Sequence, residues 1–410
     1  MRIVFVNLHA NEMLVRTLPK YVFKQSVALK HKYLLDYLLR HPEYEICSYI
    51  NDRGFDLFHN GPSLLIDFAN LFRFAESNLV LRKNGIDPKK ITVLRSAAEI
   101  RPDDIVIIYR HHGEQLRHAE DIHAFKAVSM IHFWGQRKEA DALKKARVSC
   151  LFNESNLQKC SEIFQRYYHY HGPWIVHPFV FGERFNNRKP FHERKNMAFA
   201  TGTITYKSDP DFLEVYGDPC DQPSRKQIKD HPDFFKDTVY CTSSDYNEDS
   251  SEKKISDKDN RLIRLYKLFY NRTHTGQQKK YFSFNMVDAF NDYKMCIVGE
   301  EVLGVPGIGF VEGMACGCAY IGIDSPMYRD LGLIPGKHYI TYDGSIEDLR
   351  RVIEYYQADD HQKELEDIAG TGCEYVRIHF NGDAAAEYLL EQLKNQQKDW
   401  KERRMKSLKG

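Results

Sequence analysis

The sequence predicts an α/β protein with two Rossmann-like domains facing across a cleft. Short apolar runs recur along the chain, separated by helix-like segments. The runs are apolar almost throughout, which is typical of strands buried on both faces of a parallel sheet. A chain of 410 residues suits two domains of roughly 150 to 250 residues each. The expected strands are residues 2–7, 104–109, 129–134, 148–153, 174–179, 197–202, 238–242, 294–299 and 318–323.

The domain boundary is expected near residues 180–196, where a highly charged segment lacks apolar periodicity. We therefore expect an N-terminal Rossmann-like domain over residues 1–182 and a C-terminal one over 183–380. Residues 381–410 favour a terminal helix with a basic tail. The polar residues 243–260 are expected to form a solvated loop inside the second domain.

Composition excludes several classes of protein. The 58 basic and 57 acidic side chains leave a net charge of +1, so no global field favours nucleic acid. The nine cysteines include no C-x-x-C pair, and reduced thiols in a cytoplasmic protein are expected. The start, MRIVFVN, reads as a strand rather than a signal peptide. No stretch of 18 apolar residues is present, so no membrane-spanning helix is expected.

The basic C-terminal tail has two interpretations. Its cations suit the negative end of a helix dipole, so a solvated terminal helix is the simpler one. The other is a weak contact with an anionic membrane surface, helped by Trp400, which would place the protein at the inner face of the membrane.

The stretch GVPGIGFVEGMACGCAYIG, residues 304–322, is the most informative part of the chain. A strand is expected to end just before it and a helix to begin at VEGMACG. Glycine allows positive φ and the close approach of another molecule to the backbone. The strand-to-helix loop contains Gly304, Gly307 and Gly309.

This loop predicts a nucleotide site. The first N–H groups of the following helix are unpaired and favour an anion, most naturally phosphate. Glu312, in the first helical turn, would repel phosphate but can accept hydrogen bonds from both hydroxyls of a ribose. A glycine-rich turn that only packs the helix against the sheet is the alternative. The backbone expected to hold the diphosphate belongs to Gly307, Ile308, Gly309 and Phe310.

The segment that begins GIGFVEGMACGCAYIGIDSPMYRDLG and continues to about residue 380 resembles the nucleotide-binding half of group 1 glycosyltransferases of the GT-B fold. That family carries a glycine-rich loop, an acid, small residues and a strand in this order. Its E-x7-E pattern places two acids eight residues apart. Glu312 matches the second acid, whereas Gly304 occupies the position of the first, which faces the donor sugar in the family.

The resemblance implies further site residues. The second domain of such enzymes opens with a strand and a Gly/Thr loop, which Thr201 and Gly202 match. Lys294 corresponds to a basic residue that stabilises the leaving diphosphate, and Arg225 is a second phosphate partner, since its fork fits phosphate oxygens. Surface positions are the alternative for both.

In the first domain, histidines follow expected strands, whose carboxyl ends face the ligand in open α/β sheets. His111 and His112 are the best candidates for a general base or acceptor contact, although a structural role is the alternative for any single histidine. The triplets DPD (209–211) and DKD (257–259) fit the letters of a D-x-D metal motif, but such triplets are common by chance, and no metal or other cofactor is expected.

The predicted function is transfer of a sugar from a nucleotide-sugar donor to a hydroxyl of a glycan or glycolipid acceptor. The resemblance suggests a role in bacterial surface polysaccharide synthesis. Two alternatives remain open: another nucleotide-sugar enzyme such as an epimerase, and a catalytically inactive GT-B module that binds a glycan or a protein partner.

Overall fold

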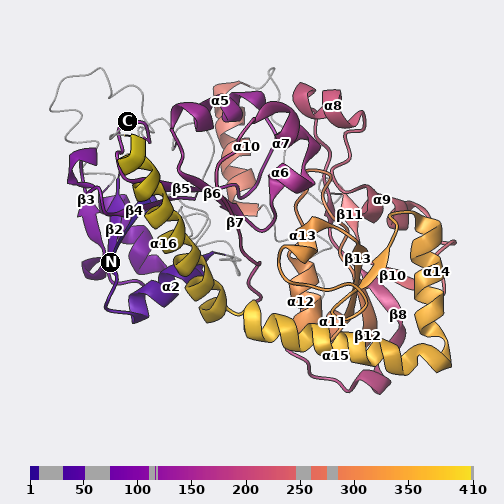
Figure 1. Ribbon diagram of the computed structural model, residues 1–410. Coiled ribbons are helices and arrows are strands. Elements are labelled where there is room, and N and C mark those ends of the chain that lie inside the picture. The colour runs from indigo at the N-terminus through magenta and orange to yellow at the C-terminus, as the bar shows by residue number, and fades with distance from the viewer. Residues whose placement is uncertain are drawn as a thin grey trace. The chain divides into compact units, whose positions relative to one another are not determined.

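The computed structural model describes residues 1–8, 31–50, 74–109, 116, 119–245, 260–274 and 285–407. The chain divides into two units (Figure 1). Unit 1 comprises Met1–Asn153, Tyr167–His177 and Ala385–Gly410, and unit 2 comprises Glu154–Arg166 and Pro178–Ala384. The helix expected within residues 381–410 is α16 (Gly382–Ser407), and most of it belongs to unit 1.

Unit 1 is built on one parallel sheet. Its strands are β1 (Arg2–Val6), β2 (Glu45–Tyr49), β3 (Thr92–Leu94), β4 (Ile105–Ile108), β5 (Phe125–Ser129), β6 (Cys150–Asn153) and β7 (Trp174–Val176). They are ordered β3-β2-β1-β4-β5-β6-β7. Its helices are α2 (Lys32–Arg40), α5 (Arg137–Lys145), most of α16 (Gly382–Ser407), a helix over residues 74–83, and the 3₁₀ helices η3 (Pro88–Lys90) and η4 (Ala97–Glu99).

Both faces of this sheet are buried. Phe5 and Ile107 point into a core shared with α2 and α16, whereas Val4 and Val106 point to the other face and are equally inaccessible. Val4 pairs with Cys47 on one side and with Val106 on the other. Burial on both faces explains why these strands read as continuous apolar runs.

The predicted strand over residues 129–134 is wrong. The strand is β5, which ends at Ser129, and His132 has a positive φ of 53° in the following turn. The charge of Lys126 obscured β5 in the sequence. Lys126 is only 4% exposed, and its Nζ donates hydrogen bonds to the carbonyls of Ala119 and Ala146, both at 2.6 Å. The buried ammonium is therefore satisfied by backbone oxygens.

Unit 2 contains a five-stranded parallel sheet with the order β10-β8-β12-β13-β14 and a two-stranded extension of β9 and β11. The strands are β8 (Lys195–Ala200), β9 (Thr203–Ile204), β10 (Val239–Cys241), β11 (Ser244–Asp245), β12 (Tyr293–Ile297), β13 (Ala319–Ile323) and β14 (Ile340–Tyr342). The helices are α6 (Leu157–Cys160), α7 (Glu162–Tyr167), α8 (Pro210–Tyr216), α9 (Pro223–Asp230), α10 (Arg261–His274), α11 (Met286–Asp292), α12 (Gly309–Ala315), α13 (Pro326–Arg329), α14 (Ile346–Gln357), α15 (Gln362–His379) and the 3₁₀ helices η5 (Phe191–Glu193) and η7 (Asp359–His361).

Helices cover both faces of this sheet too. Met295 and Ile297 of β12 point into a core that includes residues of α9 and α14. Cys296, between them, points toward α12, where its Sγ would lie 2.5 Å from a Cβ at Gly313. Two parallel sheets with helices on both faces confirm the predicted fold class, α/β with two Rossmann-like domains.

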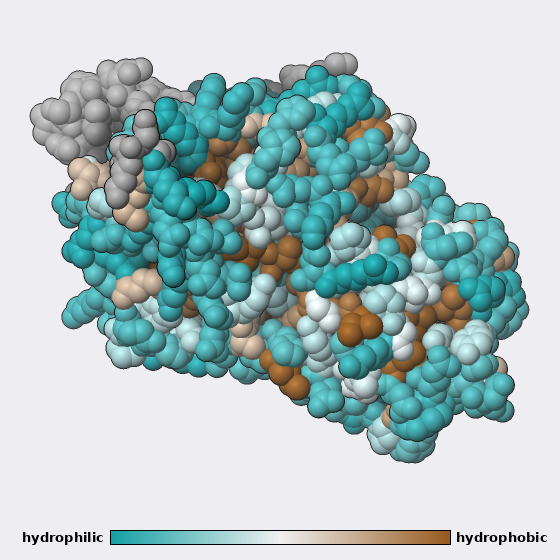
Figure 2. Space-filling model, in the orientation of Figure 1, coloured by the Kyte–Doolittle hydropathy of each residue, from teal (hydrophilic) through white to brown (hydrophobic). Residues whose placement is uncertain are grey.

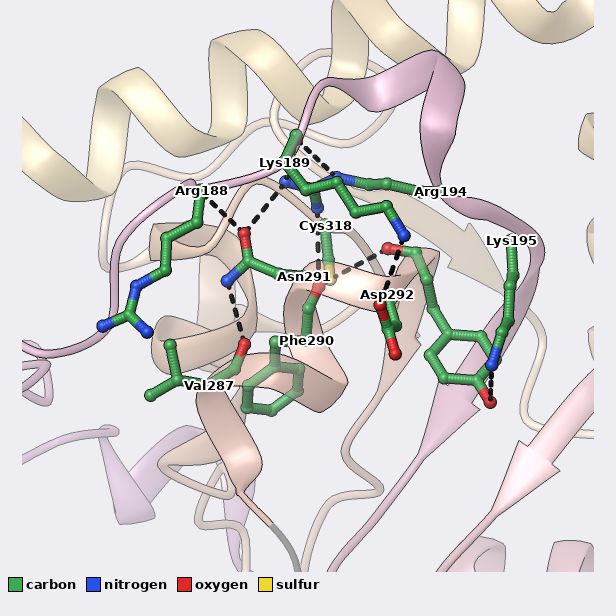
Figure 3. A network of polar contacts seen from close by, with 10 residues as sticks. Arg188, Lys189, Arg194, Lys195, Val287, Phe290, Asn291, Asp292 and Cys318 are labelled. Carbon is green, nitrogen blue, oxygen red and sulfur yellow. Dashed lines mark hydrogen bonds and ion pairs between the residues drawn. The ribbon is translucent and has the colours of Figure 1, made fainter.

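The charged segment near residues 180–196 belongs to unit 2, and a polar network around Arg194 fixes it to the rest of that unit (Figure 3). Arg194 is 4% exposed, and its Nη2 donates to Asn187 Oδ1 and to the Cys316 carbonyl, both at 2.7 Å. The backbone N–H of Arg188 donates to Asn291 Oδ1 at 2.7 Å. Arg194 thus ties this segment to the C-termini of α11 and α12, where a cation is favoured.

The face of the molecule shown in Figure 2 is mainly hydrophilic, with small scattered hydrophobic patches. Within the described ranges, no helix combines the length and the apolar character that crossing a membrane requires. Residues 246–259 of the expected loop over 243–260 lie outside the described residues. Ser244–Asp245, at its start, form β11.

Candidate functional site

The topology of unit 2 defines where a ligand is expected to bind. From β8 the chain passes to β10 on one side of the sheet and then to β12 on the other. This reversal is a topological switch point, and open α/β sheets bind ligands just outside the carboxyl ends of the strands at such a point. Two loops meet there: residues 201–202 after β8, and residues 298–308 between β12 and α12.

Arg225 joins these two loops. It lies near the start of α9 and is 8% exposed. Its Nε donates to the Gly299 carbonyl at 2.9 Å, and its Nη1 donates to the Thr203 carbonyl at 2.7 Å. Among the described residues its hydrogen bonds involve only these two nitrogens, so the N–H groups of Nη2 remain available for an anion. The structure thus places a fixed guanidinium at the switch point.

Three glycines make room for this side chain. A Cβ on Gly202 would lie 2.8 Å from Arg225 Nε, and one on Gly307 would lie 2.7 Å from Nη2. At Gly299 a Cβ would meet Arg225 Cγ at 3.1 Å and the Ser224 hydroxyl even closer. The glycines were expected to let a ligand approach the backbone. Part of the space that they leave is filled by the Arg225 side chain. The same contacts bring Nη2 against the loop expected to meet phosphate.

The first turn of α12 supplies the rest of the predicted site. The cap residue Ile308 provides no side-chain hydrogen bond to the helix N-terminus. Gly309 allows the helix to approach β12, because a Cβ there would meet Val298 Cγ2 at 3.0 Å. Phe310 is fully buried against Tyr320, so only its backbone is available to a ligand. Glu312 lies half-buried in this turn, the position that the sequence predicted for it.

Gly304 stands where the resembling family has its first acid, and the structure shows why a glycine fits there. Its φ is +83°, and a Cβ would lie 2.4 Å from the Cys160 carbonyl oxygen. The buried Ser155 hydroxyl donates to the Gly304 carbonyl at 2.6 Å. This part of the loop is packed on α6, which leaves no room for an acidic side chain.

Beside Arg225 lies a cluster of charges that the sequence did not indicate. Asp221 is 2% exposed, and its Oδ2 forms an ion pair with Lys207 Nζ at 3.1 Å. Burial raises the pKa of the Glu301 carboxyl, and the nearby Asp221 carboxylate raises it further, whereas Arg225 and Lys207 act in the opposite direction. These two acids and two bases form one charged cluster beside the loop after β12. The only sequence signal was the pair of acids directly after Gly299.

Glu300, the first of these two acids, is held by two tyrosines. Its Oε1 accepts hydrogen bonds from the hydroxyls of Tyr328 at 2.7 Å and Tyr320 at 3.3 Å, and from the Ile323 N–H at 3.2 Å. Glu300 is 8% exposed. A buried carboxylate with three donors positions the carboxyl end of β13 relative to the loop after β12.

The other predicted site residues are placed as follows. The Thr201 hydroxyl is buried and accepts a hydrogen bond from Thr242 Oγ1 at 3.2 Å, so it joins the loops after β8 and β10. His111 and His112 lie outside the described residues. Asp209 of the DPD triplet caps α8 by accepting the Asp211 N–H at 3.0 Å, and the DKD triplet lies outside the described residues.

Lys294 is not brought to the loop. It is the second residue of β12, at the opposite end of the strand from Gly299. Its Nζ donates to Gln362 Oε1 and lies 5.5 Å from the centre of the Phe191 ring. Burial lowers the pKa of this ammonium. Lys294 lies in the strand that leads into the loop, but at its amino end, whereas the loop follows the carboxyl end.

No protein-family model and no curated protein sequence matches the chain. Three solved structures are similar to it over nearly all of its length. Sucrose-phosphate synthase from Thermosynechococcus elongatus has a TM-score of 0.47 and 13% identity, covering 97% of this chain and 98% of that one. Anabaena HepE with UDP-glucose has a TM-score of 0.49 and 12% identity, covering 96% and 100%. A glycosyltransferase from Rickettsia africae has a TM-score of 0.48 and 12% identity, covering 96% and 98%.

Proposed function

We propose that the protein is a glycosyltransferase that takes its sugar from a nucleotide-sugar donor bound at the switch point of unit 2. The observation that carries this proposal is the position of Arg225. A guanidinium held by two backbone carbonyls, with its Nη2 against Gly307, is pre-organised for the oxygens of a diphosphate. Because it is fixed before the reaction, it stabilises the negative charge that develops on a leaving nucleoside diphosphate.

The surrounding residues take complementary roles in this proposal. The backbone from Gly307 to Phe310 contacts the diphosphate, next to the Thr201–Gly202 loop. Glu312 accepts hydrogen bonds from the ribose hydroxyls. Donor binding in this arrangement uses no metal: the Arg225 guanidinium offsets part of the diphosphate charge, and backbone N–H groups of the loop contact the remaining oxygens. Lys294 has no part in it.

For the acceptor we propose a hydroxyl of a glycan or glycolipid, bound by unit 1 with His111 and His112 as acceptor contacts or general base. Bacterial surface polysaccharide synthesis in the cytoplasm, at the inner face of the membrane, remains the proposed setting. A weak membrane contact through the basic end of α16 belongs to the same proposal. The nine cysteines, all free thiols, are compatible with a reducing compartment.

A second function is favoured by the packing at Gly304. Since that position has no room for an acid, the sugar-side contact usual in the resembling family is missing. A module that binds a glycan or a partner without turning over a donor would tolerate this loss. The two functions differ in a measurable way, because only the enzyme releases a nucleoside diphosphate.

The test is a thermal-shift screen of the purified protein against UDP, GDP, CMP, ADP and their sugars, without added metal. A ligand that binds only the folded state raises the melting temperature. We expect one nucleotide class to do so, and the matching nucleotide-sugar to yield the free nucleotide and a glycosylated acceptor. Release of an isomerised nucleotide-sugar would identify an epimerase instead. Binding without turnover would identify the inactive module, and no shift with any nucleotide would overturn the proposed site.

A further inference from the structure

Helix α10 carries an exposed apolar face that nothing in the proposed reaction uses. Its sequence is RLIRLYKLFYNRTH. Leu262 is 78% exposed, Leu265 55%, Tyr266 54% and Phe269 64%. These positions have the spacing i, i+3, i+4 and i+7, which puts them on one side of a helix. In a soluble protein that side normally faces the core, whereas here it faces outward.

The charges of the same helix all have one sign. Arg261 and Arg264 are exposed, Lys267 is partly exposed, and the helix contains no aspartate or glutamate. At 100° per residue, these three positions lie on the opposite side from the Leu262–Leu265 stripe or at its border. The result is an amphipathic helix with an apolar side and a cationic side.

We propose that α10 binds the surface of an anionic lipid bilayer. An amphipathic helix with bulky apolar residues on one side and basic residues on the other lies in the interfacial plane, with its apolar side among the acyl chains and its cations at the headgroups. Lipid phosphates provide the negative charge that the helix itself lacks, and each basic residue near such a surface contributes to binding.

A second copy of the chain is a poorer occupant of the same face. A symmetric contact brings identical patches together, so two α10 helices would place their arginines near one another without an acid in either helix. The inference does not depend on the nucleotide site, and it concerns a different surface from the basic end of α16.

The test is co-sedimentation of the full chain with vesicles of phosphatidylcholine, with and without phosphatidylglycerol. We expect binding only to the vesicles that contain phosphatidylglycerol, and loss of binding at high salt. A double variant, Leu262→Ser with Leu265→Ser, is expected to reduce the partition coefficient at least about tenfold. A second one, Arg261→Gln with Arg264→Gln, is expected to reduce it roughly 30-fold.

Two control variants make the result specific. Ile378→Ser replaces an exposed apolar residue of α15 with a similar exposed fraction, 54%, and is expected to bind like the wild type. Arg403→Gln with Arg404→Gln alters the end of α16 and should also retain the α10-dependent binding. Thermal unfolding of each variant confirms that it is folded.

Three results would overturn the proposal. One is that the wild type binds neither kind of vesicle, and another is that the Leu262→Ser, Leu265→Ser variant binds as well as the wild type. The third is that the wild type self-associates in sedimentation velocity and this variant is monomeric, which would make the α10 face an interface between copies.

Discussion

Arg225 shows how a single residue organises the candidate site. It is 23 residues from Gly202 and 82 from Gly307 along the chain, yet its side chain lies against both. Sequence reasoning predicted all three to belong to the nucleotide site, from the resemblance and from the chemistry of each residue type. It did not predict that the glycines accommodate the arginine, because that contact depends on how two loops meet at the switch point. The partners of Glu300 and Glu301 were missed for the same reason.

The first residue-scale prediction concerns Gly304. Substitution by alanine places a Cβ against the Cys160 carbonyl at a φ of +83°, and we expect it to lower the free energy of unfolding by about 2–4 kcal/mol. The matched control is Gly344→Ala, where φ is +98° and nothing lies within 4 Å of the added Cβ. It should cost about 1 kcal/mol, from backbone strain alone. Equal losses in chemical denaturation would show that the contact with α6 is unimportant.

The second residue-scale prediction concerns the pH dependence of stability. The pKa of Glu301 is raised above its ordinary value of 4.5 by burial and by Asp221, so the folded state binds this proton more tightly than the unfolded state. The contribution of Glu301 to stability therefore falls as pH rises above 4.5 through the raised folded-state pKa. Glu301→Gln keeps the uncharged form and should gain stability relative to the wild type over that window. Denaturant unfolding at pH 4 and pH 8 measures this. An equal difference in the free energy of unfolding between the two proteins at both pH values would contradict the prediction.

At the scale of elements, the sequence predicted strands best where burial made them uniformly apolar. β1, β4, β6 and β13 were found within a residue or two. β5 was displaced because Lys126 interrupts its apolar pattern, and the sequence does not reveal that two carbonyls satisfy that charge. β2 and β14 were not predicted, since EICSY and ITY are too short or too polar to stand out from helical spacers.

Helix α15 offers an element-scale prediction with a built-in control. Gly370 and Gly372 lie two residues apart in it, but a Cβ on Gly372 would lie 2.3 Å from the His338 carbonyl, whereas nothing lies within 4 Å of one on Gly370. Gly372→Ala should destabilise the protein by about 1–3 kcal/mol. Gly370→Ala should stabilise it by up to about 1 kcal/mol through helix propensity. Denaturant unfolding of both variants measures this, and a loss of stability in Gly370→Ala would contradict it.

At the scale of the whole molecule, the last helix completes the core of unit 1. Leu389 and Leu393 of α16 are fully buried with residues of β1 and β4, and Gln397 Nε2 donates to the Asp104 carbonyl at 3.0 Å. The sequence showed the helical propensity and basic end of this segment. It did not show which domain the helix packs against, because that depends on a fold formed some 300 residues earlier in the chain.

This packing predicts that substitutions at buried positions of α16 destabilise unit 1. Leu389→Ala removes a fully buried side chain and should cost about 2–5 kcal/mol, whereas Met405→Ala, at 56% exposure on the same helix, should change stability by at most about 0.5 kcal/mol. Hydrogen exchange locates the effect: amides of β1 and β4 should lose protection in Leu389→Ala, and those of β12 and β13 should keep it. Loss of protection in unit 2 alone would contradict this assignment.

The central claim is that unit 2 holds a nucleotide with Glu312 on the ribose. Calorimetric titration of the nucleotide found by thermal shift into three proteins tests it most directly: the wild type, Glu312→Ala, and Glu347→Ala as control. Glu347 is an exposed acid in the first turn of α14, after another strand of the same sheet. The account predicts that Glu312→Ala weakens binding by roughly 10- to 100-fold, the loss of about 1.5–3 kcal/mol from hydrogen bonds to a charged group, while Glu347→Ala binds like the wild type. Equal affinity in all three proteins would contradict the account.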